Sequence, residues 1–320
     1  MSTRISPTPG IVVCVPTYRR PAHLRLTLDS LARQRTGRRF AVVVAENEAE
    51  AREGAAVAQA VFAEGHLAGR VVVEARQGNC HAINAAFATA LRHYGQARHI
   101  LMMDDDEIAD PDWLEAMVAA AERTGAGIVG GPVHPRLMAG ARQALARHPA
   151  FLPAYAASGP VPMIYGSGNC LITRETFERL GLPAFDVGYN FLGGGDTDFF
   201  TRARRVGIRF HWAEDAVIGE SVPEARLHPR WLAARGLRIG AINHRIEAKH
   251  AEGRTDRARL ALKSAVLLPF SGLRALHLLV RTREPMIALH PIFVALGRCF
   301  SALGIEPEPY RAGASPEVPR

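Results

Sequence analysis

The stretch His99-Ile-Leu-Met-Met-Asp-Asp-Asp-Glu107 places four consecutive carboxylates directly after a short apolar run. An apolar run of this length between polar segments predicts a buried strand. Four adjacent carboxylates repel one another, so they are costly unless they face solvent or bind a cation. A hard divalent cation prefers such oxygen ligands and completes its shell with water and substrate phosphates. We therefore predict a metal site at the end of this strand, with a solvated acidic turn as the alternative.

Similar apolar runs alternate with helical patterns on both sides of this stretch. Strands are expected at residues 11–15, 41–45, 70–74, 127–131 and 170–173, and helices at 21–34, 49–63, 81–93 and 196–206. Asp110, followed by Pro111, is expected to cap a further helix. Residues 132–165 are expected to be rich in loops. The alternation predicts an α/β fold in which helices cover a mostly parallel sheet.

The composition is that of a globular protein in a reducing compartment. Of the 320 residues, 48% are apolar and 22% charged, which excludes disordered, collagenous and coiled-coil classes. The four cysteines form no CxxC pair, and the 13 histidines form no HxxxH or HExxH, so a disulfide framework and a zinc hydrolase are both disfavoured. The first ten residues are polar and the apolar run after them is short, so we expect no signal peptide and a cytoplasmic location.

Charge divides the chain into two parts. Residues 1–225 carry 23 Lys and Arg against 24 Asp and Glu, whereas residues 226–320 carry 16 against 7. We expect one folded domain over 1–225, with halves at about 10–115 and about 116–225, and a basic, mostly helical extension over 226–320. The concentrated charge indicates an anionic partner such as a membrane surface.

Two apolar segments of this extension, 264–280 and 286–305, are interrupted by proline and by basic residues. They are therefore expected to lie in the membrane interface rather than to cross the bilayer, or else to pack on the catalytic domain. The basic residues expected to meet lipid phosphates are Arg274, Arg281, Arg283 and Arg298.

Five motifs occur in an order that is characteristic of one family. They are Val15-Pro-Thr-Tyr-Arg-Arg-Pro21, Glu46-Asn47, Gly78-Asn-Cys-His-Ala-Ile-Asn84, Asp104-Asp-Asp106 with the trailing Pro111-Asp-Trp-Leu114, and Gly193-Gly-Gly-Asp-Thr-Asp-Phe-Phe200. In this order they resemble the landmarks of family 2 glycosyltransferases with the GT-A fold, a Rossmann-like α/β architecture. Residues 194–240 are similar to the bacterial exopolysaccharide transferases related to those of succinoglycan synthesis.

The resemblance implies that residues 1–225 are the catalytic domain, with a nucleotide-sugar (donor) half at about 10–115 and an acceptor half at about 116–225. It also implies a role for each matching residue. Asp104 and Asp106 would hold Mn²⁺ or Mg²⁺ on the donor diphosphate, and Asp196 would be the catalytic base. The nucleotide would be bound by Pro16, Thr17, Arg19, Glu46, Asn84 and Asp105. The acceptor side would include Asn169, Gly194, Gly195 and Asp198. Three positions depart from the family pattern, namely Glu46 for Asp, Ile83 for Arg and Gly195 for Glu.

The implied activity is an inverting transfer of a sugar from a nucleoside-diphosphate sugar, expected to be a UDP-sugar, to a hydroxyl of a glycan or of a lipid-linked acceptor. One alternative is a nucleotidyltransferase, but its glycine-rich phosphate loop is absent after the first strand, where Pro16-Thr-Tyr-Arg19 stands. Gly195 leaves open a catalytically degenerate membrane scaffold. No nucleic-acid partner is expected, because the basic segment has few aromatic residues for base stacking.

Two simpler interpretations concern the second acidic motif. Asp196 follows three glycines and is also a candidate helix cap. Asp198 precedes Arg202 by four residues, a spacing that fits an exposed helical ion pair.

Overall fold

A computed structural model describes residues 9–137 and 143–305, which form two compact units. The sheet unit contains the chain up to His134, then Pro153–Asn190 and Gly195–Glu220. The helical unit contains Pro135–Leu152, Phe191–Gly194 and the chain from Ser221 onward. The last crossing lies close to the division that charge suggests at residue 225. The four earlier crossings have no counterpart in the charge pattern.

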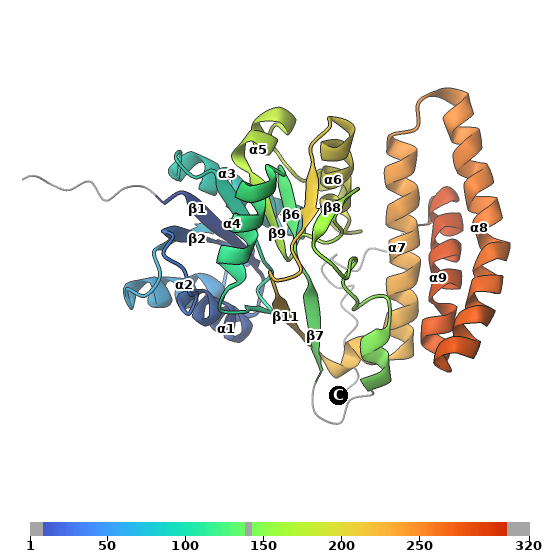
Figure 1. Ribbon diagram of the computed structural model, residues 1–320, viewed down its shortest axis with the longest axis horizontal. Helices are drawn as coiled ribbons and strands as arrows, with labels where there is room; N and C mark the ends of the chain where they lie inside the picture. Colours follow the sequence, from blue (N-terminus) through green and yellow to red (C-terminus); the bar gives the residue numbers. More distant parts are fainter. Residues whose placement is uncertain (1–8, 138–142, 306–320) are drawn as a thin grey trace, which may run out of the picture. The chain divides into compact units, whose positions relative to one another are not determined.

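The sheet unit is built on an eight-stranded sheet with the order β3-β2-β1-β4-β9-β6-β10-β8 (Figure 1). Strands β1 to β4 run parallel to their neighbours, and β10 is parallel to β6, whereas β9 is antiparallel to both β4 and β6. The prediction of a mostly parallel α/β sheet is therefore confirmed. The strands are β1 Ile11–Thr17, β2 Phe40–Glu46, β3 Gly69–Val73, β4 His99–Met102, β6 Ile128–Gly130, β8 Gly159–Val161, β9 Cys170–Thr173 and β10 Phe210–Trp212.

Helices cover this sheet largely where the apolar periodicity predicts them. They are α1 Pro21–Ala32, α2 Glu53–Ala63, α3 Asn79–His93, α4 Trp113–Thr124, α5 Arg174–Leu180 and α6 Gly195–Arg205, with a short 3₁₀ turn η2 at Val187–Tyr189. The expected cap at Asp110 is wrong, because α4 begins at Trp113 with Asp112 at the cap position and without a side-chain cap hydrogen bond. Asp110 instead accepts the Trp113 amide through its backbone carbonyl.

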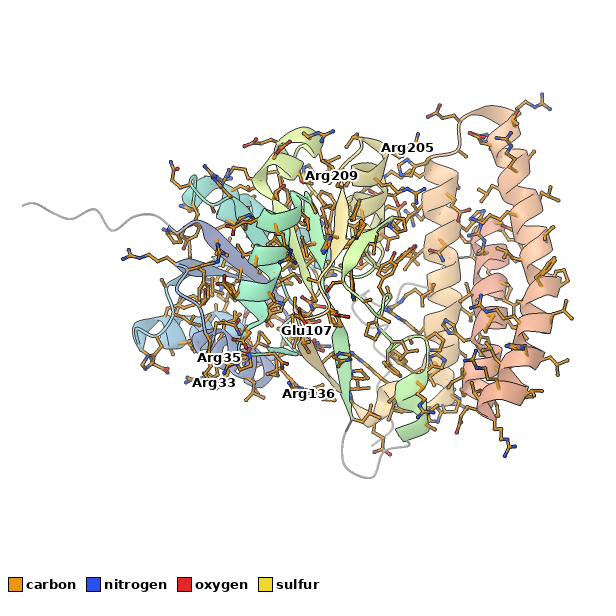
Figure 2. All side chains as sticks on the ribbon, in the orientation of Figure 1. Arg33, Arg35, Glu107, Arg136, Arg205 and Arg209 are labelled. Atoms are coloured by element: carbon orange, nitrogen blue, oxygen red, sulfur yellow. The ribbon has the colours of Figure 1, made fainter. Side chains whose placement is uncertain are left out.

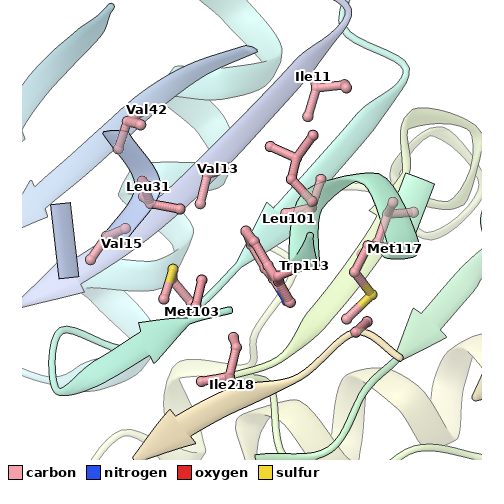
Figure 3. Packing of buried hydrophobic residues seen from close by; sticks show 14 of the residues in the cluster. Ile11, Val13, Val15, Leu31, Val42, Leu101, Met103, Trp113, Met117 and Ile218 are labelled. Carbon is pink, nitrogen blue, oxygen red and sulfur yellow. The ribbon is translucent and has the colours of Figure 1, made fainter. Parts of the chain in front are cut away.

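The core of the sheet unit lies between the sheet and helices α1 and α4. Figure 3 shows Trp113 amid side chains of β1, β4 and β11, and its indole is fully buried. The strands here are Val- and Ile-rich, as expected for strands that are buried on both faces. Cys14 and Cys170 are free cysteines that are buried in this sheet.

Residues 132–165 contain more regular structure than their composition suggests. In the described part of this segment the chain forms β7 (Val133–Leu137), a 3₁₀ turn η1 (Gln143–Arg147) and β8. A second sheet has the order β5-β11-β7, where β5 is Glu107–Ala109 and β11 is Ile218–Val222. Prediction of a loop-rich segment is thus only partly right, because these strands are too short to show periodicity.

The helical unit confirms the helical character expected after residue 226. It contains η3 (Glu224–Leu227), α7 (Pro229–Lys249), α8 (Gly253–Thr282) and α9 (Pro285–Ala302), and α9 lies between α7 and α8 (Figure 1). The side chain of Arg298 on α9 is 3% exposed and makes two hydrogen bonds of 3.0 and 2.9 Å to Glu247 of α7. The expectation that Arg298 meets lipid is therefore wrong.

Candidate active site

The acidic stretch lies at the carboxyl edge of the sheet, as the sequence predicts. Strands β1, β2 and β4 run in the same direction, and Thr17 at the end of β1 is in register with Glu46 at the end of β2. The chain leaves β4 at Met102 and turns through Asp104–Asp106 into β5. This edge is where ligands bind in open α/β sheets.

The turn is held by residues of β1 and α1. The hydroxyl of Thr17 donates to Asp105 Oδ2 at 2.7 Å, and Thr27 donates to the backbone carbonyl of Asp105 at 2.9 Å. Arg20 Nη1 lies 2.8 Å from Asp106 Oδ2 and 3.3 Å from Asp105 Oδ1. Arg20 thus neutralises part of the acidic charge, although its own side chain is 44% exposed.

Burial and mutual repulsion raise the pKa values of the remaining acids. The carboxyl of Glu107, labelled in Figure 2, accepts the Asp104 amide at 2.6 Å, and Glu107 pairs across the strands with Glu220 of β11. Burial, and then repulsion from Asp106 and Asp105, raise the pKa of Asp104 to about 8. Burial and the charge of Asp104 hold the pKa of Glu107 well above its ordinary value. This edge of the sheet therefore favours the arrival of positive charge.

The carboxylate oxygens of this turn fit a hard divalent cation. A methyl group at Gly168 would lie 2.4 Å from Glu107 Oε1 and 3.1 Å from Asp104 Oδ2, so the backbone there approaches the acids closely. Among the residues that the structure describes, no three His, Cys, Asp or Glu side chains form a ready-made ligand set. Mg²⁺-type sites often use one or two carboxylates and complete their shell with water and substrate phosphates, so Asp104 and Asp106 suffice as protein ligands.

Glu46 and its neighbour support loops from inside the fold. Glu46 is fully buried, and its two carboxylate oxygens accept the amides of Glu48 and Ala55 at 2.9 and 3.0 Å. Asn47 accepts the Gly78 amide at 2.7 Å and donates to the carbonyls of Glu74 and Arg76. Glu46 thus positions the chain after β2 and the start of α2, and its contact with a nucleotide remains a prediction.

The remaining nucleotide-side residues divide into exposed and buried groups. Pro16 and Thr17 are buried at the end of β1. Arg19 is largely exposed, has a positive φ of 54° and forms an ion pair with Glu48. Only Arg19 of these three has a side chain open to a ligand.

Asn84 fixes the segment before α6. Its amide nitrogen donates to the carbonyl of Phe185 and its oxygen accepts the amide of Phe185, both at 2.8 Å. Asn190 binds the start of α3 in the same manner, since it accepts the Cys80 amide at 3.1 Å and donates to the Gln77 carbonyl at 2.9 Å. The expected place of Asn84 near the nucleotide remains a prediction.

Asp196 and Asp198 occupy different environments although both lie in the first turn of α6. Asp198 has no exposed surface and accepts a 3.0 Å hydrogen bond from Arg202 Nε, so the expected ion pair exists but is not exposed. Asp196 is only partly buried, follows the first residue of the helix, and accepts hydrogen bonds from backbone amides that include those of Thr197 and Gly166. Burial nevertheless raises the pKa of Asp196, while these hydrogen bonds act in the opposite direction. Of the two acids, Asp196 is the one that a substrate can reach.

Steric crowding explains why position 195 is a glycine. A Cβ at this position would lie 2.8 Å from Cys80 Sγ and 3.2 Å from the ring of Phe185. The chain therefore has no room for the acid that the family pattern places before Asp196. Gly194, with a φ of +92°, belongs to the helical unit, where a Cβ would lie 2.5 Å from Ile242.

Asn169 holds neighbouring segments together. It is 5% exposed, donates to the carbonyls of Pro132 and Ala216, and accepts the indole N–H of Trp113 at 2.8 Å. Its amide thus joins three segments, and its contact with an acceptor remains a prediction.

Sequence comparison gives the family of this site. Residues 9–237 match the family model described as "Glycosyltransferase like family 2". The chain belongs to glycosyltransferase family 2. The matched residues contain every acid discussed above, including Asp196 and Glu220.

Individual relatives agree with this family 2 assignment. The chain is 32% identical over 265 residues to the succinoglycan biosynthesis protein ExoM of Rhizobium meliloti, covering 80% of each protein. Among solved structures, the mannosyltransferase PcManGT of Pyrobaculum calidifontis, in complex with GDP-Man and Mn²⁺, matches with a TM-score of 0.60 at 22% identity over 92% of this chain and 88% of that one. TarS of S. aureus (residues 1–349) matches with a TM-score of 0.52 at 15% identity, over 92% and 91%. These structures confirm the GT-A fold.

Three residues of the site are absent from the sequence-based set. Arg20 contacts two acids of the turn, and Glu107 and Glu220 meet beside Asp104. The pair Arg19-Arg20 is a sequence signal for Arg20. Two neighbouring side chains at the end of a strand point in different directions, so one of the two arginines is expected to face the adjacent loop. Glu220 has no local signal, since pairing of β5 with β11 brings it there.

Proposed function

We propose that this family 2 protein is an inverting, metal-dependent glycosyltransferase of exopolysaccharide synthesis. Its donor is a nucleoside-diphosphate sugar, a UDP-sugar by our expectation, and its acceptor is a hydroxyl of a glycan or a lipid-linked saccharide. The relation to ExoM supports the biosynthetic class. The observation that carries the enzymatic assignment is the partly accessible Asp196 at the start of α6, beside an acid that is sealed and paired.

Asp196 acts as the general base. In a single displacement, the acceptor oxygen attacks the anomeric carbon, its proton passes to the Asp196 carboxylate, and the bond from the anomeric carbon to the diphosphate oxygen breaks. The nucleoside diphosphate leaves with the bonding electron pair, so the configuration inverts. The elevated pKa makes Asp196 a stronger base than an ordinary aspartate, which favours proton transfer near neutral pH.

The turn after β4 binds the donor diphosphate. Asp104 and Asp106 would hold Mn²⁺ or Mg²⁺, which supplies charge neutralisation for the departing diphosphate. The Mn²⁺ complex of PcManGT, a protein of the same fold, supports this role. For Asp104 in particular, no hydrogen bond to the carboxyl occurs among the described residues, so it remains open to a ligand.

Arg20 has two successive partners in this proposal. Without the donor it binds Asp105 and Asp106, which limits the repulsion among the acids. With a cation at Asp106, Arg20 would be repelled from that carboxylate and would be available to pair with a phosphate of the donor. Arginine suits this exchange, because its planar fork binds carboxylate and phosphate alike.

The experiment that tests the function is a donor screen on the full chain. Thermal unfolding is measured with UDP-, GDP- and other nucleotide sugars, each with Mn²⁺, with Mg²⁺ and with chelator. A ligand at 100 times its Kd stabilises the folded state by about 2.7 kcal/mol, so the true donor raises Tm measurably. We expect stabilisation by one nucleotide class, dependent on the cation. Stabilisation by nucleoside triphosphate and sugar phosphate together, but not by a nucleotide sugar, would favour a nucleotidyltransferase.

The proposed place of action is the inner face of the cell membrane. Lipid-linked acceptors lie there, and the basic excess of residues 226–320 suits an anionic surface. Helices α8 and α9 are both long and apolar enough to cross a membrane by length and composition, with mean hydropathies of 1.2 and 1.3.

A further inference from the structure

Helix α8 buries small side chains and exposes large apolar ones, which is the opposite of the usual arrangement for a helix in water. Its buried residues are the small side chains Ser264, Ser271 and Ala275. Six of its large apolar side chains are 43–74% exposed and form what we call the outer face: Leu262, Val266, Phe270, Leu273, Leu276 and Val280. Helices of soluble proteins normally turn such residues inward, and contiguous exposed apolar patches mark interaction surfaces.

The spacing of these residues shows that they form one stripe. Positions 262, 266, 273, 276 and 280 recur at helical intervals and lie opposite the buried seam of positions 264, 271 and 275. Arg274 and Arg281 are exposed and stand one residue further around, seven positions apart, so they line one edge of the stripe. An apolar stripe with a basic edge is the pattern of a helix that lies in an anionic membrane interface.

The inner side of α8 is anchored to the helical unit. Glu247 of α7 accepts hydrogen bonds from Arg298 of α9 and from Lys263 of α8, the latter at 2.8 Å. Backbones of α7 and α9 touch closely, since a Cβ at Gly297 would lie 1.9 Å from the Leu237 carbonyl oxygen. Insertion of α8 across a bilayer together with these partners would carry three charged groups into hydrocarbon, which is costly. This favours a helix lying on the surface.

The burial of small residues on the inner side of α8 also indicates that the outer face contacts lipid rather than water. In a membrane environment, helices meet through small residues and direct large apolar ones to lipid. The hydroxyl of Ser271 donates to the Leu268 carbonyl at 2.6 Å, so it is satisfied within its own helix without water. The charge of the segment agrees, with 16 basic against 7 acidic residues in 226–320.

We propose that the outer face of α8 docks along an anionic lipid bilayer, with Leu273, Leu276 and Val280 entering the interface and Arg274 and Arg281 contacting lipid phosphates. This deepens the proposed membrane location and does not depend on the transfer chemistry. The outer face runs from position 262 to position 280 and is about 27 Å long at 1.5 Å per residue, so it is too long to be an incidental apolar spot.

The test is flotation of the full chain with vesicles of phosphatidylcholine and phosphatidylglycerol in equal parts, and of phosphatidylcholine alone. The apolar variant combines Leu273→Ser, Leu276→Ser and Val280→Ser; its control carries Leu26→Ser, Leu182→Ser and Val206→Ser, which are also exposed. The charge variant combines Arg274→Glu and Arg281→Glu; its control carries Arg92→Glu and Arg98→Glu, which are exposed residues of the sheet unit.

We expect the native chain and both controls to float with the anionic vesicles, and binding by each α8 variant to fall about tenfold or more. Unfolding midpoints should stay unchanged, because the substituted side chains are exposed. Donor-induced stabilisation should also persist in every variant, so loss of membrane binding is separable from failure of the proposed transfer activity.

Three results would overturn the proposal. The first is a native chain that does not float with anionic vesicles. The second is an apolar variant that binds as well as its control. The third is a native dimer, seen by sedimentation, that the apolar variant abolishes without any vesicle binding, which would assign the outer face to a second copy of this chain.

Discussion

The carboxyl edge of the sheet and the outer face of α8 break the rule of polar outside and apolar inside in opposite senses. At the sheet edge, acids are drawn into the fold, and burial raises the pKa values of Asp104 and Glu107. On α8, leucines are left outside while serines are buried. Each region is unfavourable in water alone, so each indicates a partner of complementary chemistry: a cation with a diphosphate at one, lipid at the other.

Asp106→Asn should have the largest effect, because it removes a ligand from the acid-rich edge. We expect turnover to fall about 10³-fold, since charge neutralisation by a metal contributes several kcal/mol. The fold should persist, because Asp105 keeps its bond with Thr17. Initial transfer rates and thermal unfolding measure the two effects. If transfer continues unchanged in the presence of chelator, the acid-rich edge does not act through a bound cation.

Asp196→Asn should lower kcat by about 10² or more, the scale of losing a general base, while donor affinity and cation dependence are retained. The wild-type kcat/KM should fall on acidification, because the base acts in its ionised form. Since burial raises the pKa of Asp196, this acid limb should lie at higher pH than for an ordinary aspartate. The limb should be missing from Asp196→Asn.

The matched control is Asp198→Asn, two residues away on the same helix. It leaves Arg202 without its buried partner and should cost about 3 kcal/mol of stability, with activity retained in the protein that stays folded. Urea unfolding and transfer assays separate these outcomes. A folded but inactive Asp198→Asn beside an active Asp196→Asn would reverse the two assignments.

Two glycine substitutions compare the packed interior of the helical unit, at Gly297, with its exposed side, at Gly272. Gly297→Ala should destabilise by about 3 kcal/mol, because the new Cβ meets the Leu237 backbone and overpacks the contact of α7 with α9. Gly272→Ala lies in the middle of α8 with nothing within 4 Å of the new atom, and should stabilise by about 0.5–1 kcal/mol. Urea midpoints measure both. A comparable loss at Gly272 would show that the outer side is covered in solution.

Arg20→Ala should give the smallest effects, with opposite signs for the two ligands. Removing the arginine takes a positive charge away from Asp106 and should tighten the binding of Mn²⁺ alone, while the donor loses a phosphate partner and binds about tenfold more weakly. Isothermal titration of each ligand measures this, and Arg20→Lys serves as the control that keeps the charge. If both ligands bind more weakly to Arg20→Ala, the arginine is only a structural support.

Local pattern predicts the fold and part of the site. The strand at 99–103, the acids after it and the helix at residue 196 follow from periodicity and from adjacent charges, and the family order of motifs identifies the GT-A fold. Side-chain direction is not accessible in this way. Glu46, Asn84 and Asn169 lie in the expected motifs, yet each spends its polar atoms on backbone groups that only the folded chain brings near.

Gly195 links positions that are distant in the sequence. Because a Cβ there would meet Cys80 and Phe185, these three sites cannot vary independently. A homologue that carries an acid before its base needs a smaller residue, or a shifted helix start, where Cys80 stands. We therefore expect residues 80, 185 and 195 to co-vary across the family. Glutamate at position 195 should be tolerated only when the side chains at positions 80 and 185 are made smaller.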